Sequence, residues 1–407
     1  MDQSAVRAAL GAIDDQSTIE ITRQLARVPA PLGEEGPLAA VVAELLDRPG
    51  IDVHVQAVTP GRPNVIATVR GLGGAGGEGA LGLLLNAHLD AAVAPGGARD
   101  PYQAAVEGNR LYAGGITDMK GPLAAMIAAL RAAAALPTPP PGDFVLQAVM
   151  AHNPTGVGTK FALASEQPFR GVAIAGQGSS LRLRTESGGA IKWEVAFEGR
   201  AAHVSIKEQG ADALAAARRV ADALDDFAFS HSPHERLPGL PRFVVGELIA
   251  GGRAGVPALL PGSGVPDLAT IRGDVRTVPG MTRWTVRADL DELLARVGTG
   301  DVRVRTRIVS EVHPFIGERE GPLIRALSEA HELVRGAPPE FAAGLGQLAF
   351  VTDAPDLARV GLPTVGYGPG PWRYEPDEWI ELDELLDAPR IYLATALMIS
   401  ALTRQPR

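Results

Sequence analysis

The stretch LGLLLNAHLD, residues 81–90, decides the fold of this chain. It begins as an unbroken apolar run and ends in polar residues that include His88 and Asp90. A continuous apolar run is typical of a parallel strand that is buried on both faces of its sheet. Polar side chains that follow such a strand lie at the carboxyl edge of the sheet, where α/β proteins bind ligands. We therefore expect a parallel sheet with a candidate site at this edge.

The segments around this strand repeat the same design. Residues 144–150 form a second apolar run, which again ends in polar residues, His152 and Asn153. Between the two runs, residues 121–136 are rich in Ala and predict a buried helix that stops at the prolines of 137–141. Alternating strands and helices indicate an α/β domain. Further elements are predicted on its N-terminal side: helices over 4–27 and 36–47, a strand over 62–71 and a Gly-rich loop over 72–79.

The pattern changes near residue 187. The order of predicted elements becomes β-α-β-β-α-β, which is a complete ferredoxin-like unit. We therefore predict an α/β/α sandwich domain, formed by residues 1–186 and 313–407, with a ferredoxin-like lid or dimerisation domain inserted at 187–312. The inserted elements are strands at 190–199, 242–249, 267–276 and 301–312 and helices at 211–227 and 282–297; the first domain resumes with a helix at 321–335 and a strand at 362–370.

Composition excludes several functions. The 407 residues carry a net charge of -9 at pH 7 and are only 5% aromatic, which argues against a nucleic-acid partner because phosphate binding needs clustered Lys and Arg. The N-terminal segment lacks the charged and apolar regions of a signal peptide. The longest apolar stretch, residues 123–136, is interrupted by Arg131 and is too short to span a bilayer. We expect a cytoplasmic protein without membrane or nucleic-acid partners.

Three polar clusters carry the candidate chemistry. They are His88 with Asp90, Asp118 at the start of the Ala-rich helix, and His152 with Asn153. His and Asp at one sheet edge favour a metal or acid–base site. Each signal has an ordinary alternative, because a single His at a strand end is often only hydrogen-bonded there and an Asp at a helix start is often an N-cap.

Longer motifs resemble the zinc metallopeptidase and deacylase family of acetylornithine deacetylase, succinyl-diaminopimelate desuccinylase and glutamate carboxypeptidase. The resemblance covers nearly the whole chain and rests on these stretches: LARVPAPLGEEGPLAAVVAELL, GRPNVIA, NAHLDAAV, DPYQAAVEGNRLYAGGITDMKGPLAAM, FEGRAAHVSIKEQGADAL, GDVRTVPGM, GLPTVGYGPG and EPDEWIELDEL. It implies a two-zinc active site for amide hydrolysis and a homodimer formed through the inserted domain.

Several site residues follow from the resemblance. His88 matches a zinc ligand, Asp90 the acid that orients it, and Asp118 the carboxylate that bridges both metals, with a cis peptide bond expected between Asp118 and Met119. On the substrate side, His203 matches a lid histidine that acts in the partner's active site, and Arg276 an arginine that binds a substrate carboxylate. The remaining matches are to pocket walls, at Thr352, Asp353, Gly368 and Gly370.

The chain departs from the family at four positions. Relatives carry Glu-Glu, a general base and a zinc ligand, where this chain has His152 and Asn153. They carry an acid at the position of Gln177 and a His at the position of Tyr374. Neutral amide oxygens are poor zinc ligands, and a tyrosine binds only as a phenolate. We therefore expect no normal two-zinc centre and no cofactor, or at most one weakly held zinc ion on His88 and Asp118.

Three functions remain open at this point. The first is a divergent enzyme that acts on an amide of an N-acyl amino acid or peptide-like substrate with a carboxylate, by hydrolysis, acyl transfer or cyclisation. In it, His152 or His88 with Asp90 or Asp118 would exchange protons, and Tyr374, Asn153 and Gln177 would donate hydrogen bonds. The second is a conventional metal-dependent deacylase or peptidase. The third is a non-catalytic homologue that binds a carboxylate ligand or a partner protein.

Overall fold

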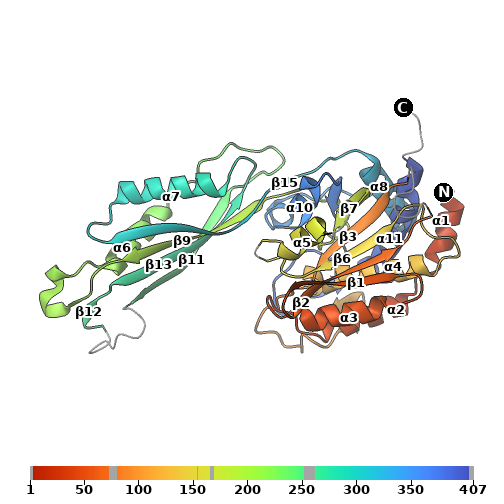
Figure 1. Ribbon diagram of the computed structural model, residues 1–407, viewed down its shortest axis with the longest axis horizontal. Helices are drawn as coiled ribbons and strands as arrows, with labels where there is room; N and C mark the ends of the chain where they lie inside the picture. The colour runs from red at the N-terminus through yellow and green to blue at the C-terminus, as the bar shows by residue number, and fades with distance from the viewer. Residues whose placement is uncertain (1–2, 73–79, 154, 166–168, 252–261, 403–407) are drawn as a thin grey trace. The chain divides into compact units, whose positions relative to one another are not determined.

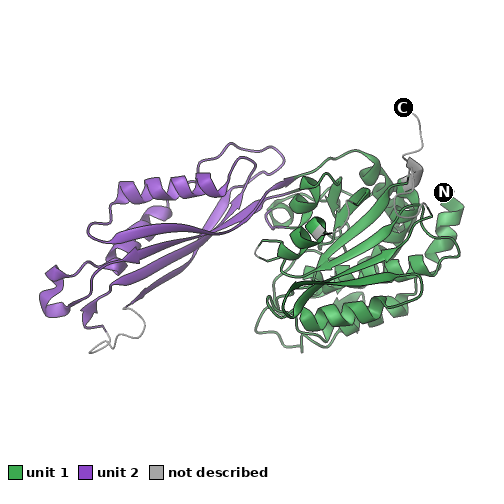
Figure 2. Ribbon diagram, viewed as in Figure 1, with its two compact units in different colours: residues 1–186, 316–348, 352–407 green, residues 187–315, 349–351 purple. Residues whose placement is uncertain are grey.

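The computed structural model describes residues 3–72, 80–153, 155–165, 169–251 and 262–402. They form two compact units, each with its own sheet (Figure 2). Unit 1 consists of residues 1–186, 316–348 and 352–407, and unit 2 of residues 187–315 and 349–351. The boundaries predicted from sequence place the second crossing at 312/313, a few residues before the crossing at 315/316.

Unit 1 is built on a six-stranded sheet with the order β1-β2-β6-β3-β7-β16 (Figure 1). The last four strands in this order are parallel, whereas β1 and β2 run antiparallel at one edge. Every residue of β3 and β6 is buried, which confirms the interpretation of the two apolar runs. The strands are β1 (Asp52–Thr59), β2 (Arg62–Val69), β3 (Gly82–His88), β6 (Phe144–Val149), β7 (Gly171–Ala175) and β16 (Thr364–Gly366).

Helices pack on this sheet and complete its core. The predicted Ala-rich helix is α4 (Gly121–Ala134), which is buried along almost its whole length and contacts α2, α11 and β6. Its small side chains allow this close packing between sheet and helices. The other helices of unit 1 are α1 (Gln3–Leu10), α2 (Asp15–Ala26), α3 (Gly36–Leu46), α5 (Val157–Ser165), α8 (Pro322–Arg335), α9 (Leu345–Leu348), α10 (Ala354–Arg359) and α11 (Leu382–Leu402).

A small three-stranded sheet, ordered β17-β5-β4, contacts the turn at Ile116–Lys120, which comes directly before α4. It joins segments that are far apart in the sequence, because β17 (Trp379–Glu381) pairs with β5 (Arg110–Tyr112), which in turn pairs with β4 (Ala105–Glu107). This pairing brings the C-terminal part of the chain to the loop that carries Asp118.

Unit 2 has a four-stranded antiparallel sheet with the order β11-β13-β9-β14. Its elements follow one another as β-α-β-β-α-β, so the predicted ferredoxin-like domain is confirmed. The main elements are β9 (Gly189–Glu198), α6 (Ala213–Leu224), β11 (Arg242–Gly251), β13 (Leu268–Thr277), α7 (Arg283–Val297) and β14 (Arg303–Val312). Four short strands accompany them or connect the units: β8 (Glu186–Ser187), β10 (Ala202–His203), β12 (Gly264–Val265) and β15 (Phe315–Ile316).

Some local predictions differ from the structure. The helix predicted over 4–27 is two helices, because the Asp14 side chain accepts hydrogen bonds from the backbone N–H groups of Gln16 and Ser17 and so caps a new start. The strand predicted over 362–370 is shorter, since only Thr364–Gly366 pairs with β7. The Gly-rich loop predicted at 72–79 lies, except for its first residue, outside the described residues. No helix in the described part of the chain is long and apolar enough to cross a membrane.

Candidate active site

Three neighbouring parallel strands deliver polar residues to one edge of the sheet. His88 ends β3, His152 follows β6, and Gln177 follows β7. The rings of His88 and His152 stack with their centroids 4.5 Å apart and an angle of 13° between their planes. The carboxyl edge therefore holds a buried pair of imidazoles at its centre.

His88 is held at both ring nitrogens. Its Nδ1 lies 2.8 Å from the backbone carbonyl oxygen of Asp90, and its Nε2 lies 3.0 Å from Oδ1 of Asp118. The Asp90 carboxylate is further away, at 3.7 Å from Nδ1, so the closest contact of Asp90 with His88 is made by its main chain. The role of the Asp90 carboxylate in orienting His88 stays a prediction. Burial opposes protonation of His88, but the adjacent Asp118 outweighs it and raises the pKa of His88 to about 9.

Asp118 collects hydrogen bonds from several parts of the chain. Its Oδ1 accepts a second hydrogen bond from Nε2 of Gln177, at 2.8 Å, and its Oδ2 accepts one from Nε1 of Trp372, at 3.2 Å. The peptide bond between Asp118 and Met119 is cis, as the resemblance implies. Burial opposes ionisation of Asp118, yet the charge and hydrogen bond of His88 lower its pKa. No sequence pattern predicts the role of Trp372, which lies two residues before the expected Tyr374.

His152 forms a second histidine–carboxylate pair. Its Nδ1 lies 2.8 Å from Oδ1 of Asp353, whose Oδ2 accepts a hydrogen bond from the Thr159 hydroxyl at 2.9 Å. Both side chains of the pair are buried. Burial disfavours the charged form of both side chains, but the attraction between them has the larger effect. It raises the pKa of His152 and lowers the pKa of Asp353. Asp353, expected only as a pocket wall, is thus part of the central cluster.

Asp90 anchors the segment that carries His152. Its Oδ1 accepts a hydrogen bond from the backbone N–H of His152 at 2.8 Å, and its Oδ2 accepts one from the backbone N–H of Asn153 at 3.1 Å. The Asn153 side chain also points to Asp90, at 3.4 Å. The loop after β6 is therefore fixed to the loop after β3 by one buried carboxylate.

The predicted pocket walls lie around these groups. Gly368 requires its glycine, because a Cβ atom there would come within 2.7 Å of the backbone oxygen of Gln177. Gly370 adopts a φ of +73°, and its N–H donates to Glu384. Thr352 is buried and its hydroxyl accepts a hydrogen bond from the N–H of Ala354. These residues shape the backbone beside Gln177 and at the start of α10.

Three predicted residues are not joined to this cluster by a described contact. Tyr374 is 58% exposed and makes no hydrogen bond to the cluster among the described residues, so its catalytic role stays a prediction. His203 and Arg276 belong to unit 2. There, His203 is exposed with Nδ1 near Ser205, and Nε of Arg276 lies 3.2 Å from Oδ1 of Asp274. Their roles also stay predictions.

Sequence reasoning missed a buried carboxylate that holds the Asp118 loop in place. Glu378 accepts hydrogen bonds from the backbone N–H of Gly115 at 3.0 Å and from the backbone N–H of Thr117 at 2.7 Å, and also from the Thr117 hydroxyl. Burial outweighs these bonds and raises the pKa of Glu378 to about 7. The only signal in the sequence was its place in the EPDEW motif, four residues after Tyr374.

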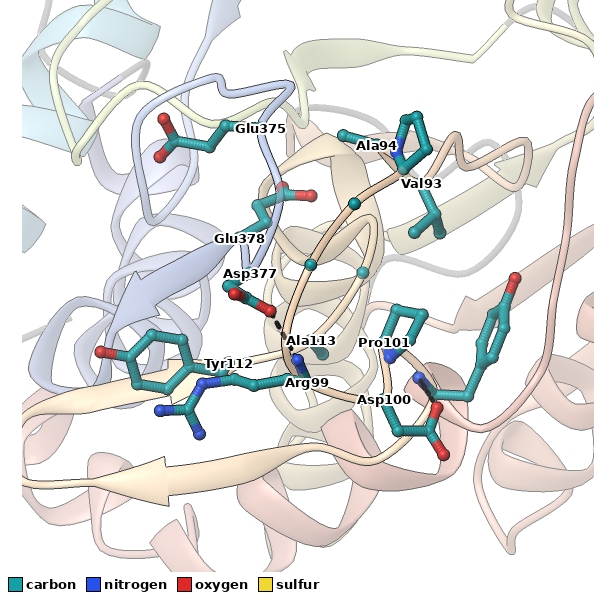
Figure 3. Close-up of a pocket in the computed structure, with 15 residues that line it drawn as sticks. Val93, Ala94, Arg99, Asp100, Pro101, Tyr112, Ala113, Glu375, Asp377 and Glu378 are labelled. Carbon is teal, nitrogen blue, oxygen red and sulfur yellow. Dashed lines mark hydrogen bonds between the residues drawn. The ribbon is translucent and has the colours of Figure 1, made fainter.

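Glu378 also lines a cavity of about 340 Å³ (Figure 3). The figure shows the side chains of Glu375, Asp377 and Glu378 on one side of it, with Asp377 bonded to the backbone of Arg99. Neither histidine of the pair nor Asp118 lines this cavity. Its remaining lining comes from the loops 93–102 and 112–114.

Comparison with known proteins places this chain among peptidases. The family model described as "Peptidase family M20/M25/M40" matches residues 84–398. The chain belongs to this family. It is 28% identical over 344 residues to an acetylornithine deacetylase from Pectobacterium atrosepticum, an alignment that covers 82% of each chain. The family predicted from the sequence motifs is therefore confirmed.

Solved structures share the fold. The di-peptidase Dug1p from Saccharomyces cerevisiae superposes with a TM-score of 0.79 at 14% identity, covering 98% of this chain and 99% of that one. A Bacillus subtilis protein described as a dinuclear metal binding peptidase from the M20 family superposes with a TM-score of 0.67 at 16% identity, covering 96% and 99%. The predicted sandwich with an inserted domain agrees with these matches.

The expectation about cofactors is corrected by the same comparisons. The four substituted positions predict no cofactor, or at most one weakly held zinc ion. The chain instead belongs to a peptidase family in which a member of the same fold is described as binding a dinuclear metal centre. The substitutions at ligand positions therefore do not exclude a metal-dependent protein.

The residues present fit a metal ion in part. Nε2 of His88 and Oδ1 of Asp118 lie 3.0 Å apart, a separation that two ligands of one ion can adopt at metal–ligand distances of about 2.0–2.2 Å. Rotation of the Gln177 amide would bring a neutral oxygen to the same place. Within the described residues, no group of three or more His, Asp or Glu side chains converges in a metal-binding arrangement. Of the residues in this cluster, His88 and Asp118 are the pair whose side-chain atoms are placed to share one ion.

Proposed function

We propose that this protein is a metal-dependent amide hydrolase that acts on an N-acyl amino acid or a short peptide. The observation that carries the proposal is the cluster of His88, Asp118 and His152 at the carboxyl edge of the sheet. Imidazoles and carboxylates held this closely supply the proton transfers that amide hydrolysis needs. Family membership and the similarity to a deacetylase support the same reaction class.

Each residue of the cluster has a proposed task. His88 and Asp118 would hold a divalent metal ion, which when bound supplies a Lewis acid for the amide carbonyl. His152 accepts and returns a proton beside it, while Asp90 fixes the loop that carries His152. The Asp118 side chain is 26% exposed, whereas those of His88 and His152 are 3% exposed, so Asp118 is the member of the cluster most open to a ligand.

Substrate recognition is proposed for the residues around the cluster. Asn153 and Gln177 carry amide N–H groups that can donate to an oxyanion or a carboxylate. Arg276 would bind a substrate carboxylate, to which its planar guanidinium is suited, and His203 would reach the active site of a partner subunit. Tyr374 would donate a hydrogen bond, and Thr352, Gly368 and Gly370 would form the walls. A homodimer through unit 2 and a place in the cytoplasm are part of this proposal.

The experiment that tests the function is turnover by the purified protein. The protein, supplied with zinc, cobalt or manganese, is incubated with a panel of N-acetyl, N-succinyl and N-formyl amino acids and dipeptides, and release of free amine is measured. We expect amine release from at least one compound, lost in His88→Gln. The matched control is His331→Gln, which changes another buried histidine of unit 1. Absence of amine release from the whole panel would contradict the proposal.

Arg276 gives a narrower test of the substrate class. If it binds a substrate carboxylate, Arg276→Ala raises KM for carboxylate-bearing substrates by roughly tenfold or more and changes kcat much less. Substrates in which the carboxylate is amidated should not show the difference. An equal effect on both sets of substrates would show that Arg276 does not bind a substrate carboxylate.

A further inference from the structure

Asp353 occupies the N-cap position of α10 but does not cap the helix with its side chain. Carboxylates at this position usually accept hydrogen bonds from the first free N–H groups of their own helix. Here the carboxylate points away from the helix, toward His152 and Thr159. A Cβ atom at Gly156 would come within 2.9 Å of Oδ1 of Asp353, so the loop before α5 keeps a glycine beside this carboxylate.

The contacts of Asp353 determine which nitrogen of His152 carries a proton. A carboxylate accepts hydrogen bonds, so Nδ1 of His152, 2.8 Å from Oδ1, is the donor. Nε2 is then the nitrogen that remains for exchange with a substrate. The ring has little freedom to turn away, because it stacks on His88 and its backbone N–H is bound by Asp90.

A purely structural role would not need a charge at this place. Burying a carboxylate costs free energy unless it is paired and hydrogen-bonded, and Asp353 is 5% exposed. An asparagine could accept the hydrogen bond from His152 and donate one to the Thr159 hydroxyl, without a buried charge. A carboxylate that accepts a hydrogen bond from one ring nitrogen of a histidine orients the imidazole and fixes its tautomer. Proteins use this arrangement where the other ring nitrogen transfers protons.

We propose that Asp353 is the positioning residue for His152 and holds it in the Nδ1–H tautomer, with Nε2 directed to the substrate. This inference rests on the proposed hydrolase function. In the reaction, Nε2 takes a proton from water as the water oxygen bonds to the amide carbon. The same nitrogen returns that proton to the leaving nitrogen as the C–N bond breaks. Water is the only co-reactant, and the products are a carboxylic acid and an amine.

The kinetic test uses Asp353→Asn with Asp356→Asn as its matched control. Both variants exchange an acid for an amide on the same short helix, but only Asp353 contacts His152. On a substrate that the parent protein hydrolyses, we expect kcat to fall by roughly 10²–10⁴-fold in Asp353→Asn, with KM within about threefold. The control should stay within about threefold in both constants. A kcat for Asp353→Asn within threefold of the parent would overturn the inference.

A spectroscopic readout separates this inference from the proposed function. In the folded parent protein labelled with ¹⁵N-histidine, the ring nitrogens of His152 are assigned by comparison with His152→Gln. At a pH where the ring is neutral, we expect the proton on Nδ1, and redistribution between the two nitrogens in Asp353→Asn.

The two readouts fail independently. An Nε2–H tautomer in the parent overturns the role of Asp353 even if the enzyme is active and the variant does not fold. An inactive parent with the Nδ1–H tautomer defeats the proposed function and retains the positioning.

Discussion

His88 and His331 lie in two regions of unit 1 that shift the pKa of a buried histidine in opposite directions. Both are buried, at 4% and 7% exposure. His331 lies on α8, and its Nδ1 is 2.7 Å from the hydroxyl oxygen of Tyr367. Burial, assisted by the nearby Arg335, lowers its pKa to about 4, whereas the pKa of His88 is raised to about 9. Burial alone therefore does not determine the charge of a histidine in this protein.

Nearby carboxylates account for the difference. His88 lies against Asp118, with Asp90 and Asp353 close enough to add to the effect. His331 has a neutral hydroxyl as its hydrogen-bond partner and a guanidinium near it. The carboxyl edge of the sheet is thus a place built to hold positive charge, from protons or from a metal ion. The helix-packed region around His331 is built to exclude it.

Removing the central carboxylate should have the largest effect. In Asp118→Asn, His88 loses the acid that supports its charge, and Gln177 and Trp372 lose a charged acceptor. We expect kcat/KM to fall by about 10²–10⁴-fold and the pKa of His88 to drop toward or below its ordinary value. Amine-release kinetics and an NMR titration of His88 measure the two effects.

Asp47→Asn is the control for that variant, since it makes the same change at an exposed helix end. Its kinetics should match the parent. An Asp118→Asn protein that keeps both its activity and the high pKa of His88 would show that the contrast with His331 has another cause.

Removal of the metal ion should have the second-largest effect on activity. After dialysis against a strong chelator, we expect activity to fall at least tenfold and to return when zinc, cobalt or manganese is added. Thermal unfolding should occur at a lower temperature in the metal-free protein, because a ligand that binds the folded state stabilises it. Full activity in protein shown to be metal-free by elemental analysis would refute the metal-dependent part of the proposal.

A carboxylate added beside Asp118 should increase the difference between this edge of the sheet and the region around His331. Gln177→Glu places an acid where the Gln177 amide now donates to Asp118. A second anionic oxygen at this place should raise the affinity for a divalent ion by roughly tenfold or more, about 1.4 kcal/mol. Isothermal titration with zinc measures the change, with the surface variant Gln16→Glu as control. Unchanged affinity would mean that Gln177 does not face the ion.

The last prediction concerns His331, leaves activity at neutral pH unchanged and appears as a pH dependence of stability. The pKa of His331 is about 4 in the folded protein and about 6.5 when unfolded. As the pH falls from 6.5 to 4, the unfolded chain binds a proton that the folded chain does not, so stability decreases by about 3 kcal/mol in total. His331→Gln should lose this part of the acid sensitivity.

Thermal melts of parent and His331→Gln at pH 7 and pH 4.5 test the point. The parent's melting temperature should decrease by a few degrees more than that of the variant. Equal decreases would show that His331 is protonated in the folded protein and that the two histidines do not differ as described.

Much of this arrangement could be predicted from the sequence. The buried strands β3 and β6 were evident as apolar runs, and the polar residues after them, such as His88, His152 and Asn153, were expected at one edge. Asp353 and Trp372 were not expected as partners of His152 and Asp118. They come from segments that follow the inserted unit in the sequence, and their contacts depend on tertiary packing that no local pattern encodes. Asp353 in particular resembles an ordinary helix cap.

The division of unit 1 into separate stretches of chain has a consequence for synthesis. His88, Asp118 and His152 are made before unit 2, whereas Asp353, Trp372 and Glu378 are made after it. During translation, residues 187–315, which make up nearly all of unit 2, are therefore complete before the partners of the first half of the site are made. At about 5–20 residues per second, the ribosome spends many seconds on the intervening chain. Throughout that time, His152 and Asp118 lack the hydrogen-bond partners Asp353 and Trp372 that they have in the complete protein.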